Sequence, residues 1–230
     1  MRLIIIGCEY TGKTTLVQGL FDWLEENMGP DQFGQPLLHD HFVLPFSEGV
    51  GSEREEEAEQ VLSMRPSLLE KYSRYMIDYH FQFFQDTHHT LINWYYGDAV
   101  YAPIYYGYGG PDQFADRQAL ARSYDAKVMK MAPDSVLVLL KASAGIVRQR
   151  KRENPHPRCI LKDQDVELVL QRFEEQYLRS QIRRRFTLDT TDSTPKSTLQ
   201  EFLRKMEPHF SVQDRLALLA HERLMGILSS

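Results

Sequence analysis

Close to the start of the chain, a glycine-rich stretch fits the pattern G-x-x-x-x-G-K-[ST] at every fixed position. The stretch reads GCEYTGKTT, and its fixed residues are Gly7, Gly12, Lys13 and Thr14. An aliphatic run at 3–6 precedes it, as is typical of a strand buried on both faces. Apolar residues at helical spacing follow between 14 and 27. The pattern therefore predicts a loop that joins a buried strand to the N-terminus of a helix.

A loop in this setting is suited to binding phosphate groups. The free N–H groups and the positive dipole at a helix N-terminus attract anions, and glycines let the backbone curve around phosphate oxygens. We expect Lys13 to reach the β and γ phosphates and the Thr14 hydroxyl to hold Mg²⁺. A chance glycine-rich turn is the alternative, but it explains neither the strand nor the helix. The nucleotide contacts expected from the loop are Gly7, Glu9, Tyr10, Thr11, Gly12, Lys13, Thr14 and Thr15.

Composition narrows the class of protein and its partners. The chain has 230 residues and a net charge of −5, which suits one sizeable α/β domain and argues against a dedicated nucleic-acid binder. Its two cysteines, Cys8 and Cys159, do not form a disulfide framework. No signal-peptide pattern is visible, and the apolar runs are too short to cross a bilayer. We therefore expect a cytoplasmic protein that binds a small-molecule substrate, and neither nucleic acid nor membrane.

Strand-like runs alternate with helical patterns along the whole chain. This alternation predicts an α/β fold, a three-layer sandwich around a five-stranded parallel sheet with right-handed crossovers. We expect one domain over 1–230, with an additional helix at 212–228 whose apolar face packs on the core or pairs with a second copy of the chain. The expected strands are 3–6, 36–44, 89–95, 135–142 and 185–191, and the main expected helices are 14–27, 66–87, 113–132, 143–154, 165–182 and 195–207.

A phosphate-binding loop alone does not separate a kinase from a GTPase, a motor or a regulatory ATPase, so the residues at other strand ends matter. Asp40 ends the second expected strand, at the edge where ligands bind to open α/β sheets. A carboxylate there is suited to accept the proton of a hydroxyl that attacks the γ-phosphate. An ordinary turn cap is the alternative. His39 and His41 form an H-x-H pair, but no further ligands at close spacing favour zinc.

A basic segment follows the fourth expected strand. Arg148 and Arg152 are four residues apart and share a helix face, and guanidinium groups match phosphate oxygens. The segment at about 143–164 resembles the LID of nucleoside and nucleotide kinases, which implies that it closes over the phosphates. A solvated basic helix end would have the same pattern. Arg150 lies off that face and is expected to be solvated or to stack on adenine.

The polar turn after the last strand, which includes Thr191, resembles the segment that borders the adenine ring in the same kinases, which implies a contact with the base. A plain helix N-cap by Ser193 or Thr194 is the alternative.

Aromatic side chains crowd one part of the chain. Nine of the twelve tyrosines lie between 72 and 108, and the stretch 92–110 is typical of a loop. Aromatic rings can stack on a flat heterocycle, although core packing explains many of them equally well. The expected substrate contacts are Asp40, His41, Phe42, Tyr95, Asp98, Tyr101 and Arg122.

Together these motifs resemble the P-loop nucleoside and nucleotide kinases over about residues 1–205. Asp40-His41-Phe42 is similar to the Asp-x-Phe pattern of uridine and nicotinamide riboside kinases, and the arginine segment resembles the LID of thymidylate kinase. One motif departs from the family. Thymidylate kinases follow the third strand with Asp-Arg-Tyr and deoxynucleoside kinases with Glu-Arg-Ser, whereas this chain has Asn93-Trp94-Tyr95. The acid that helps to hold magnesium and the arginine that contacts the acceptor are therefore both replaced.

The resemblance implies an ATP- and Mg²⁺-dependent kinase that transfers the γ-phosphate to a hydroxyl of a nucleoside-like molecule. Lys13 would hold the phosphates, Asp40 would deprotonate the acceptor and share in holding the metal, and Arg148 and Arg152 would neutralise the charge in transfer. Asp98 is a substitute for the missing acid. A nucleoside monophosphate is the second choice of acceptor, with Arg122 or Arg158 to bind its phosphate. A non-catalytic nucleotide switch or regulatory ATPase, and a kinase of another metabolite, remain as alternatives.

Overall fold

The computed structural model describes residues 1–29, 55–83, 89–111, 113–155 and 159–228. Within these residues one parallel sheet has the strand order β2-β1-β3-β4. Its four strands are β1 Arg2–Ile6, β2 His89–Ile92, β3 Val136–Lys141 and β4 Arg184–Asp189. Five strands were expected, and the described part of the sheet has four; the remaining one, at 36–44, lies outside the described residues.

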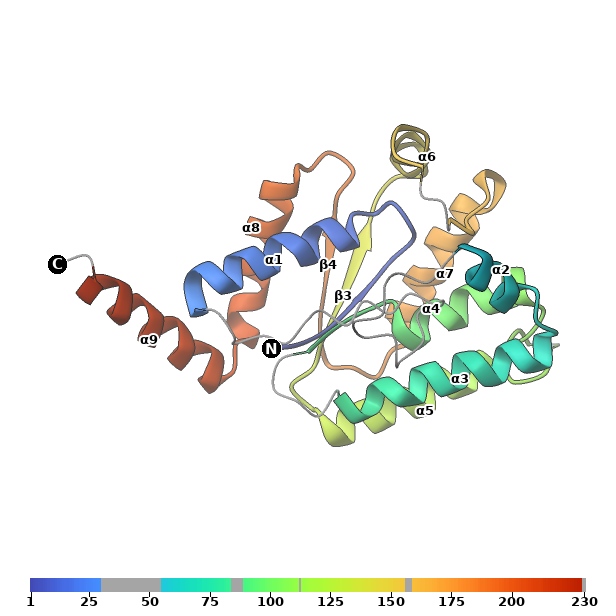
Figure 1. Ribbon diagram of the computed structural model, residues 1–230, viewed down its shortest axis with the longest axis horizontal. Helices are drawn as coiled ribbons and strands as arrows, with labels where there is room; N and C mark the ends of the chain where they lie inside the picture. The colour runs from blue at the N-terminus through green and yellow to red at the C-terminus, as the bar shows by residue number, and fades with distance from the viewer. Residues whose placement is uncertain (30–54, 84–88, 112, 156–158, 229–230) are drawn as a thin grey trace.

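Helices cover both faces of this sheet (Figure 1), so the expected three-layer α/β arrangement is confirmed. One layer is formed chiefly by α1 and α8, and the other by α3, α4, α5 and α7. The helices are α1 Lys13–Met28, α2 Glu55–Leu62, α3 Pro66–Phe83, α4 Trp94–Tyr101, α5 Arg117–Met131, α6 Ala144–Glu153, α7 Val166–Arg179, α8 Pro195–Met206 and α9 Val212–Leu228.

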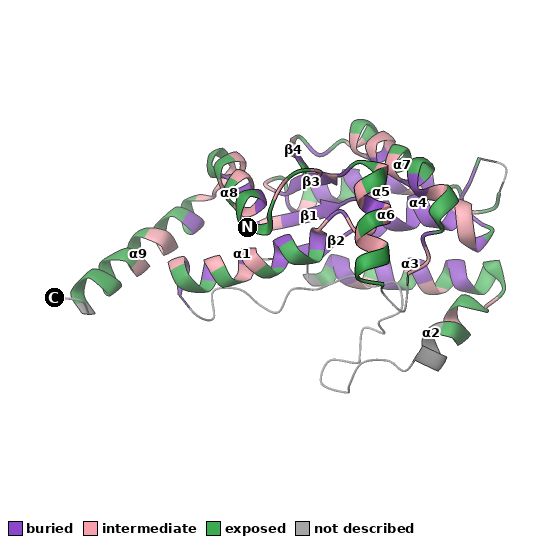
Figure 2. Ribbon diagram, turned by 90° about the horizontal axis from the view of Figure 1, so that it is seen from above, coloured by how far each residue is buried: buried purple, intermediate pink, exposed green. Residues whose placement is uncertain are grey.

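The two layers correspond to two hydrophobic cores because successive strand residues point to opposite faces. In β1, Ile4 and Ile6 pack under α4 and its neighbours, while Leu3 and Ile5 pack against α1. All four side chains are at most 1% exposed, and Figure 2 shows β1 and β3 buried between the layers. A strand with apolar residues at every position is stable only when both faces are covered, as the sequence predicted.

The aromatic stretch after β2 differs from the expected loop. β2 ends at Ile92, and α4 follows directly, continued by a π-helical turn over Ala102–Tyr106. Every side chain of α4 is buried, so the rings form the core between the sheet and α5. Burial of apolar surface explains why this segment is helical despite its loop-like composition.

The start of α5 and the packing of α9 also differ from expectation. α5 begins at Arg117, later than expected, because the Asp116 side chain caps it by accepting from Gln118 N at 2.8 Å. α9 extends away from the rest of the molecule (Figure 1) and contacts the core through Ala217 and Leu218. The face that was expected to pack on the core or to pair with a second copy of the chain is exposed, so it does not pack on the core, and pairing stays a prediction. Its residues are Leu216, Leu219, Leu224 and Ile227.

No helix in the described part of the chain combines the length and the apolar character that crossing a bilayer requires.

Candidate functional site

The loop between β1 and α1 has the strand–loop–helix geometry that the glycine pattern predicted. Gly12 adopts φ 90°, in the left-handed region, immediately before α1. A Cβ at Gly7 would come within 2.6 Å of the Leu140 carbonyl oxygen on the neighbouring strand. Both glycines are therefore required by backbone geometry. Thr14 and Thr15 are exposed on the first turn of α1.

The Lys13 side chain folds back over this loop. Its Nζ donates to the carbonyl oxygens of Gly7 at 2.8 Å and Cys8 at 2.6 Å. Burial of the ammonium lowers the pKa of Lys13 to about 8, partly opposed by the nearby Cys8 and Glu9 side chains. The two carbonyl groups only partly replace the hydration of the ammonium. An anion bound to the loop would stabilise the charged form and should therefore raise the pKa of Lys13 again.

Asn93 connects the end of β2 to the phosphate loop. Its Oδ1 accepts from Gly7 N at 3.0 Å, and its backbone has φ 60°, followed by φ 39° at Trp94. Non-glycine residues with positive φ are strained and persist only where the surroundings hold them. At the position where the resembling kinases have an acid, this chain thus uses a neutral amide to hold the loop. The sequence shows that the acid is missing, but nothing in it predicts the contact between Asn93 and Gly7.

A cavity of about 380 Å³ opens beside the phosphate loop. It combines residues of the loop, of α1, of α6 and of the turn between β4 and α8. The lining residues are Tyr10, Gly12, Thr15, Leu16, Arg150, Asn154, Thr190, Ser193, Pro195 and Thr198.

Arg150 ties three of these elements together. Its guanidinium donates to Tyr10 O at 3.1 Å, Thr190 O at 2.6 Å and Thr190 Oγ1 at 3.1 Å. The Thr190 hydroxyl in turn donates to Thr11 O at 2.9 Å. Arg150 was expected to be solvated or to stack on adenine. The structure corrects the first alternative by placing the guanidinium on the loop backbone, and stacking stays a prediction. Thr191, the predicted base contact, is next to Thr190 and donates its hydroxyl to Asp189 Oδ1 at 2.6 Å.

The other two arginines of α6 point elsewhere. Arg148 forms a two-pronged salt bridge with Glu167, at 2.7 and 2.5 Å, and Arg152 is exposed. The reason is the rotation of α6, whose buried residue Val147 packs into the core. Arg150 lies three residues further on, on the same side of the helix. The sequence shows which arginines share a face, but not which face meets the loop.

The segment after α6 is attached to the phosphate loop through Glu9. One Glu9 carboxylate oxygen accepts from Leu161 N at 3.1 Å and from the Cys159 thiol at 3.4 Å. Further along, Lys162 N donates to the Tyr105 hydroxyl at 3.2 Å. The segment that was expected to close over the phosphates therefore rests against the loop. It is held by these polar contacts and by apolar side chains such as Leu161, which is 2% exposed and belongs to the core.

The predicted substrate contacts on α4 lie inside the protein. Tyr95 is buried and donates to Asp125 Oδ1 at 2.7 Å, and burial raises the pKa of Tyr95 and of the buried Tyr101. Asp98 is 1% exposed and lies 2.5 Å from Nε of Arg117. It also accepts from the Tyr108 hydroxyl at 2.9 Å.

Other predicted residues are placed apart from this cavity or not described. Arg122 lines a second cavity between α5 and α7. Asp40, His41, Phe42 and Arg158 lie outside the described residues. Among the described residues, no group of three or more His, Cys, Asp or Glu side chains is arranged to hold a metal ion.

Comparison with known proteins gives relatives in fold only. No protein-family model matches the chain, and no curated protein matches it significantly. Among solved structures, YorR from Bacillus subtilis, in complex with phosphorylated GDP, matches with a TM-score of 0.54 and 18% identity over 91% of this chain and 99% of that one.

Deoxyadenosine kinase from M. mycoides is similar to the same extent. With bound dATP it matches with a TM-score of 0.56 and 14% identity, over 90% of this chain and 100% of that chain. With the products dCMP and dCDP it matches with a TM-score of 0.56 and 13% identity, over 90% and 99%. The expectation of a nucleoside- and nucleotide-kinase-like α/β fold is thereby confirmed.

Proposed function

We propose that this protein is an ATP- and Mg²⁺-dependent kinase that transfers the γ-phosphate to a hydroxyl of a nucleoside-like small molecule. The observation that carries the proposal is the phosphate loop with Lys13 against it, joined through Arg150 and Thr190 to an open cavity. The fold shared with a deoxynucleoside kinase supports it. A nucleotide whose phosphates lie on the loop has its base next to that cavity, which at about 380 Å³ is in the range of ligand pockets.

The described residues are compatible with a magnesium ion that binds together with the nucleotide phosphates. The ion usually keeps several waters and takes one or two protein ligands together with substrate phosphates, and the exposed Thr14 hydroxyl at the start of α1 is suited to be one of them. When bound, the metal neutralises charge on the β and γ phosphates. The second protein ligand proposed from the sequence is Asp40, because Asn93 offers no charge where the related acid would stand.

The base for the acceptor hydroxyl is proposed to be Asp40 rather than Asp98. Both oxygens of Asp98 already have partners, Arg117 at 2.5 Å and the Tyr108 hydroxyl at 2.9 Å. A carboxylate paired with a buried guanidinium is a weak proton acceptor, because the charge favours its ionised form. Asp98 is therefore better suited to position Arg117 than to take a proton.

Positive charge during transfer is assigned to Lys13 and to the arginines of α6. Arg150 is the α6 arginine whose contacts reach the phosphate loop. Arg148 and Arg152 keep the role proposed from the sequence, which for Arg148 requires release from Glu167. An exposed pair of this kind is weak because water screens both charges, so nucleotide phosphates can compete for the guanidinium.

The function is tested by measuring ADP release from Mg-ATP with panels of nucleosides, nucleoside monophosphates and sugars. We expect release with at least one nucleoside, and none from the Lys13→Ala variant, whose fold is checked by circular dichroism. Release with monophosphates alone would favour the second choice of acceptor. ATP binding without release for any acceptor would contradict the kinase proposal and favour a nucleotide switch.

A further inference from the structure

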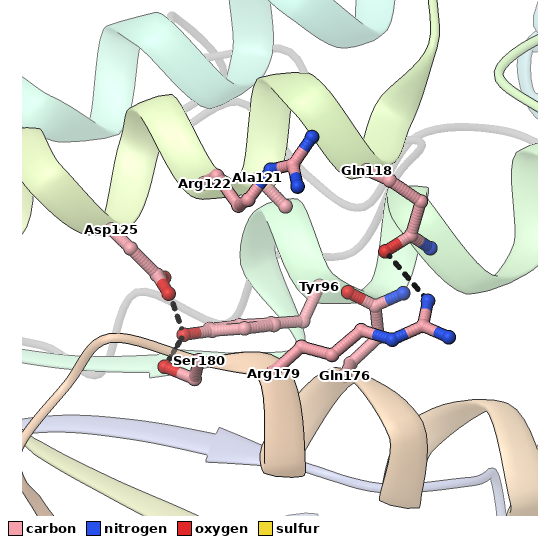
Figure 3. Close-up of a pocket in the computed structure, with 8 residues that line it drawn as sticks. All are labelled: Tyr96, Gln118, Ala121, Arg122, Asp125, Gln176, Arg179 and Ser180. Carbon is pink, nitrogen blue, oxygen red and sulfur yellow. Dashed lines mark hydrogen bonds between the residues drawn. The ribbon is translucent and has the colours of Figure 1, made fainter.

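A second cavity, of about 270 Å³, lies between α5 and α7 and shares no lining residue with the cavity beside the phosphate loop. Figure 3 shows side chains from both helices and from α4 converging on it. Seven of its eight lining residues carry a polar or charged group. The lining consists of Tyr96, Gln118, Ala121, Arg122, Asp125, Gln176, Arg179 and Ser180.

Two guanidinium groups border this cavity from opposite sides, Arg122 from α5 and Arg179 from α7 (Figure 3). Arg122 is exposed, and its guanidinium has neither an ion pair nor a hydrogen bond to the rest of the described chain. Arg179 is held more loosely than a buried pair would be, with 3.3 Å to Gln118 Oε1 and 3.8 Å to a Glu175 oxygen. Most of the hydrogen-bonding capacity of both groups is therefore available to a ligand.

The carboxylate in the cavity wall does not compete for these arginines. Asp125 is 2% exposed and accepts from the hydroxyls of Tyr95 at 2.7 Å and Tyr96 at 2.6 Å, and from Gln181 N at 2.6 Å. Burial raises the pKa of both tyrosines well above its ordinary value, so both remain donors. The Asp125 carboxylate is thus hydrogen-bonded within the protein.

Gln176 is a buried polar group without a partner. The residue is 3% exposed, and within the described residues its Nε2 donates to nothing. Its amide group extends from α7 into the space between Tyr96 and Arg179 (Figure 3). Leaving a buried N–H unpaired is costly, and an orphan of this kind calls for a partner. Rotation of the terminal amide would present the N–H to a ligand oxygen.

We propose that this cavity binds the phosphate group of a small metabolite, or free phosphate. The two arginines and the Gln176 amide supply donors from three directions, and guanidinium forks match the oxygens of a tetrahedral oxyanion. The volume accommodates a phosphate with a few carbon atoms and is small for a nucleoside triphosphate. The site is separate from the phosphate loop, so the proposal does not depend on the proposed kinase activity.

The test is calorimetric titration of the full-length protein with inorganic phosphate and with ribose 5-phosphate. Because the phosphate loop can also bind these anions, the titrations are repeated in Lys13→Ala, which should keep the second site. Arg122→Gln should weaken binding there by about tenfold or more, as expected for a charge-assisted contact. Lys130→Gln removes the same charge from an exposed position of α5 outside the cavity and should change binding by less than about twofold.

Gln176→Leu provides a second variant that keeps the side-chain volume and removes the unpaired amide. We expect it to fold and to bind phosphate more weakly. Tighter binding of ribose 5-phosphate than of inorganic phosphate would assign the site to a phosphorylated metabolite. Equal affinity for the two anions would assign it to free phosphate. The proposal is overturned if wild type binds neither anion at millimolar concentration. It is also overturned if Lys13→Ala abolishes all binding while Arg122→Gln leaves it unchanged.

Discussion

Proton uptake should accompany nucleotide binding, because the lysine of the phosphate loop is buried against two carbonyl groups. In the free protein burial lowers the pKa of Lys13 to about 8, so at pH 9 about nine-tenths of the molecules have a neutral lysine, against about one-tenth at pH 7. A phosphate anion on the loop favours the charged form and raises the pKa. Binding at pH 9 should therefore take up about 0.9 proton, and at pH 7 about 0.1.

The sign of the effect on affinity follows from the same linkage. Above the pKa of the free lysine, nucleotide binding requires Lys13 to take up a proton, and the proton concentration falls as the pH rises. The dissociation constant for Mg-ADP should therefore rise by up to about tenfold per pH unit between pH 8 and the pKa in the complex, and should change little between pH 6.5 and 7.5.

Isothermal titration calorimetry measures both quantities. Titrations of Mg-ADP at pH 7 and pH 9, each in two buffers of different ionisation enthalpy, give the number of protons taken up. Lys13→Met is the matched control, since it keeps the aliphatic stem and cannot titrate. The reasoning is refuted if uptake in the wild type is the same at both pH values, or if Lys13→Met shows the same increase.

Three further changes test the site. Arg150→Ala removes the guanidinium contacts to the phosphate loop and to Thr190 and should weaken Mg-ADP binding by about tenfold, whereas Arg148→Ala, which loses an exposed ion pair, should leave it nearly unchanged in the same titration. Asp98→Asn leaves a buried guanidinium without its full counter-charge and should lower the free energy of unfolding in urea by about 3 kcal/mol. Asp40→Asn should reduce kcat by ~10²–10⁴-fold and weaken Mg-ADP binding far less, because Lys13 and the loop amides still hold the phosphates.

Each of these expectations has a contrary result. Equal Mg-ADP affinities of Arg150→Ala and Arg148→Ala would show that the contact with the loop backbone has no part in binding. Asp98→Asn with wild-type stability but no turnover would make Asp98 the base instead of a structural acid. Normal turnover of Asp40→Asn would show that Asp40, at the end of the second expected strand, is not the base.

Features that depend on neighbouring residues in the chain were predictable. The phosphate loop needs glycines at fixed positions between a strand and a helix, and the structure shows both glycines meeting backbone constraints. β1 and β3 were predictable because their uninterrupted apolar runs, 3–6 and 136–140, require cover on both faces. The aromatic stretch was misjudged as a loop, since ring-rich composition does not distinguish a buried helix from a loop until its packing is known.

The contacts of the candidate site were decided by tertiary structure. Asn93 meets Gly7 across 86 residues, and Arg150 meets Thr190 across 40, distances over which local preference carries no information. The sequence by itself determined that a phosphate loop would form and that α6 would carry arginines. Which arginine faces the loop follows from the rotation that buries Val147, and the cavity between α5 and α7 exists only because two helices pack with polar side chains between them. Helical spacing determines which residues share a face, whereas the partner of each face depends on how the whole chain buries its apolar surface.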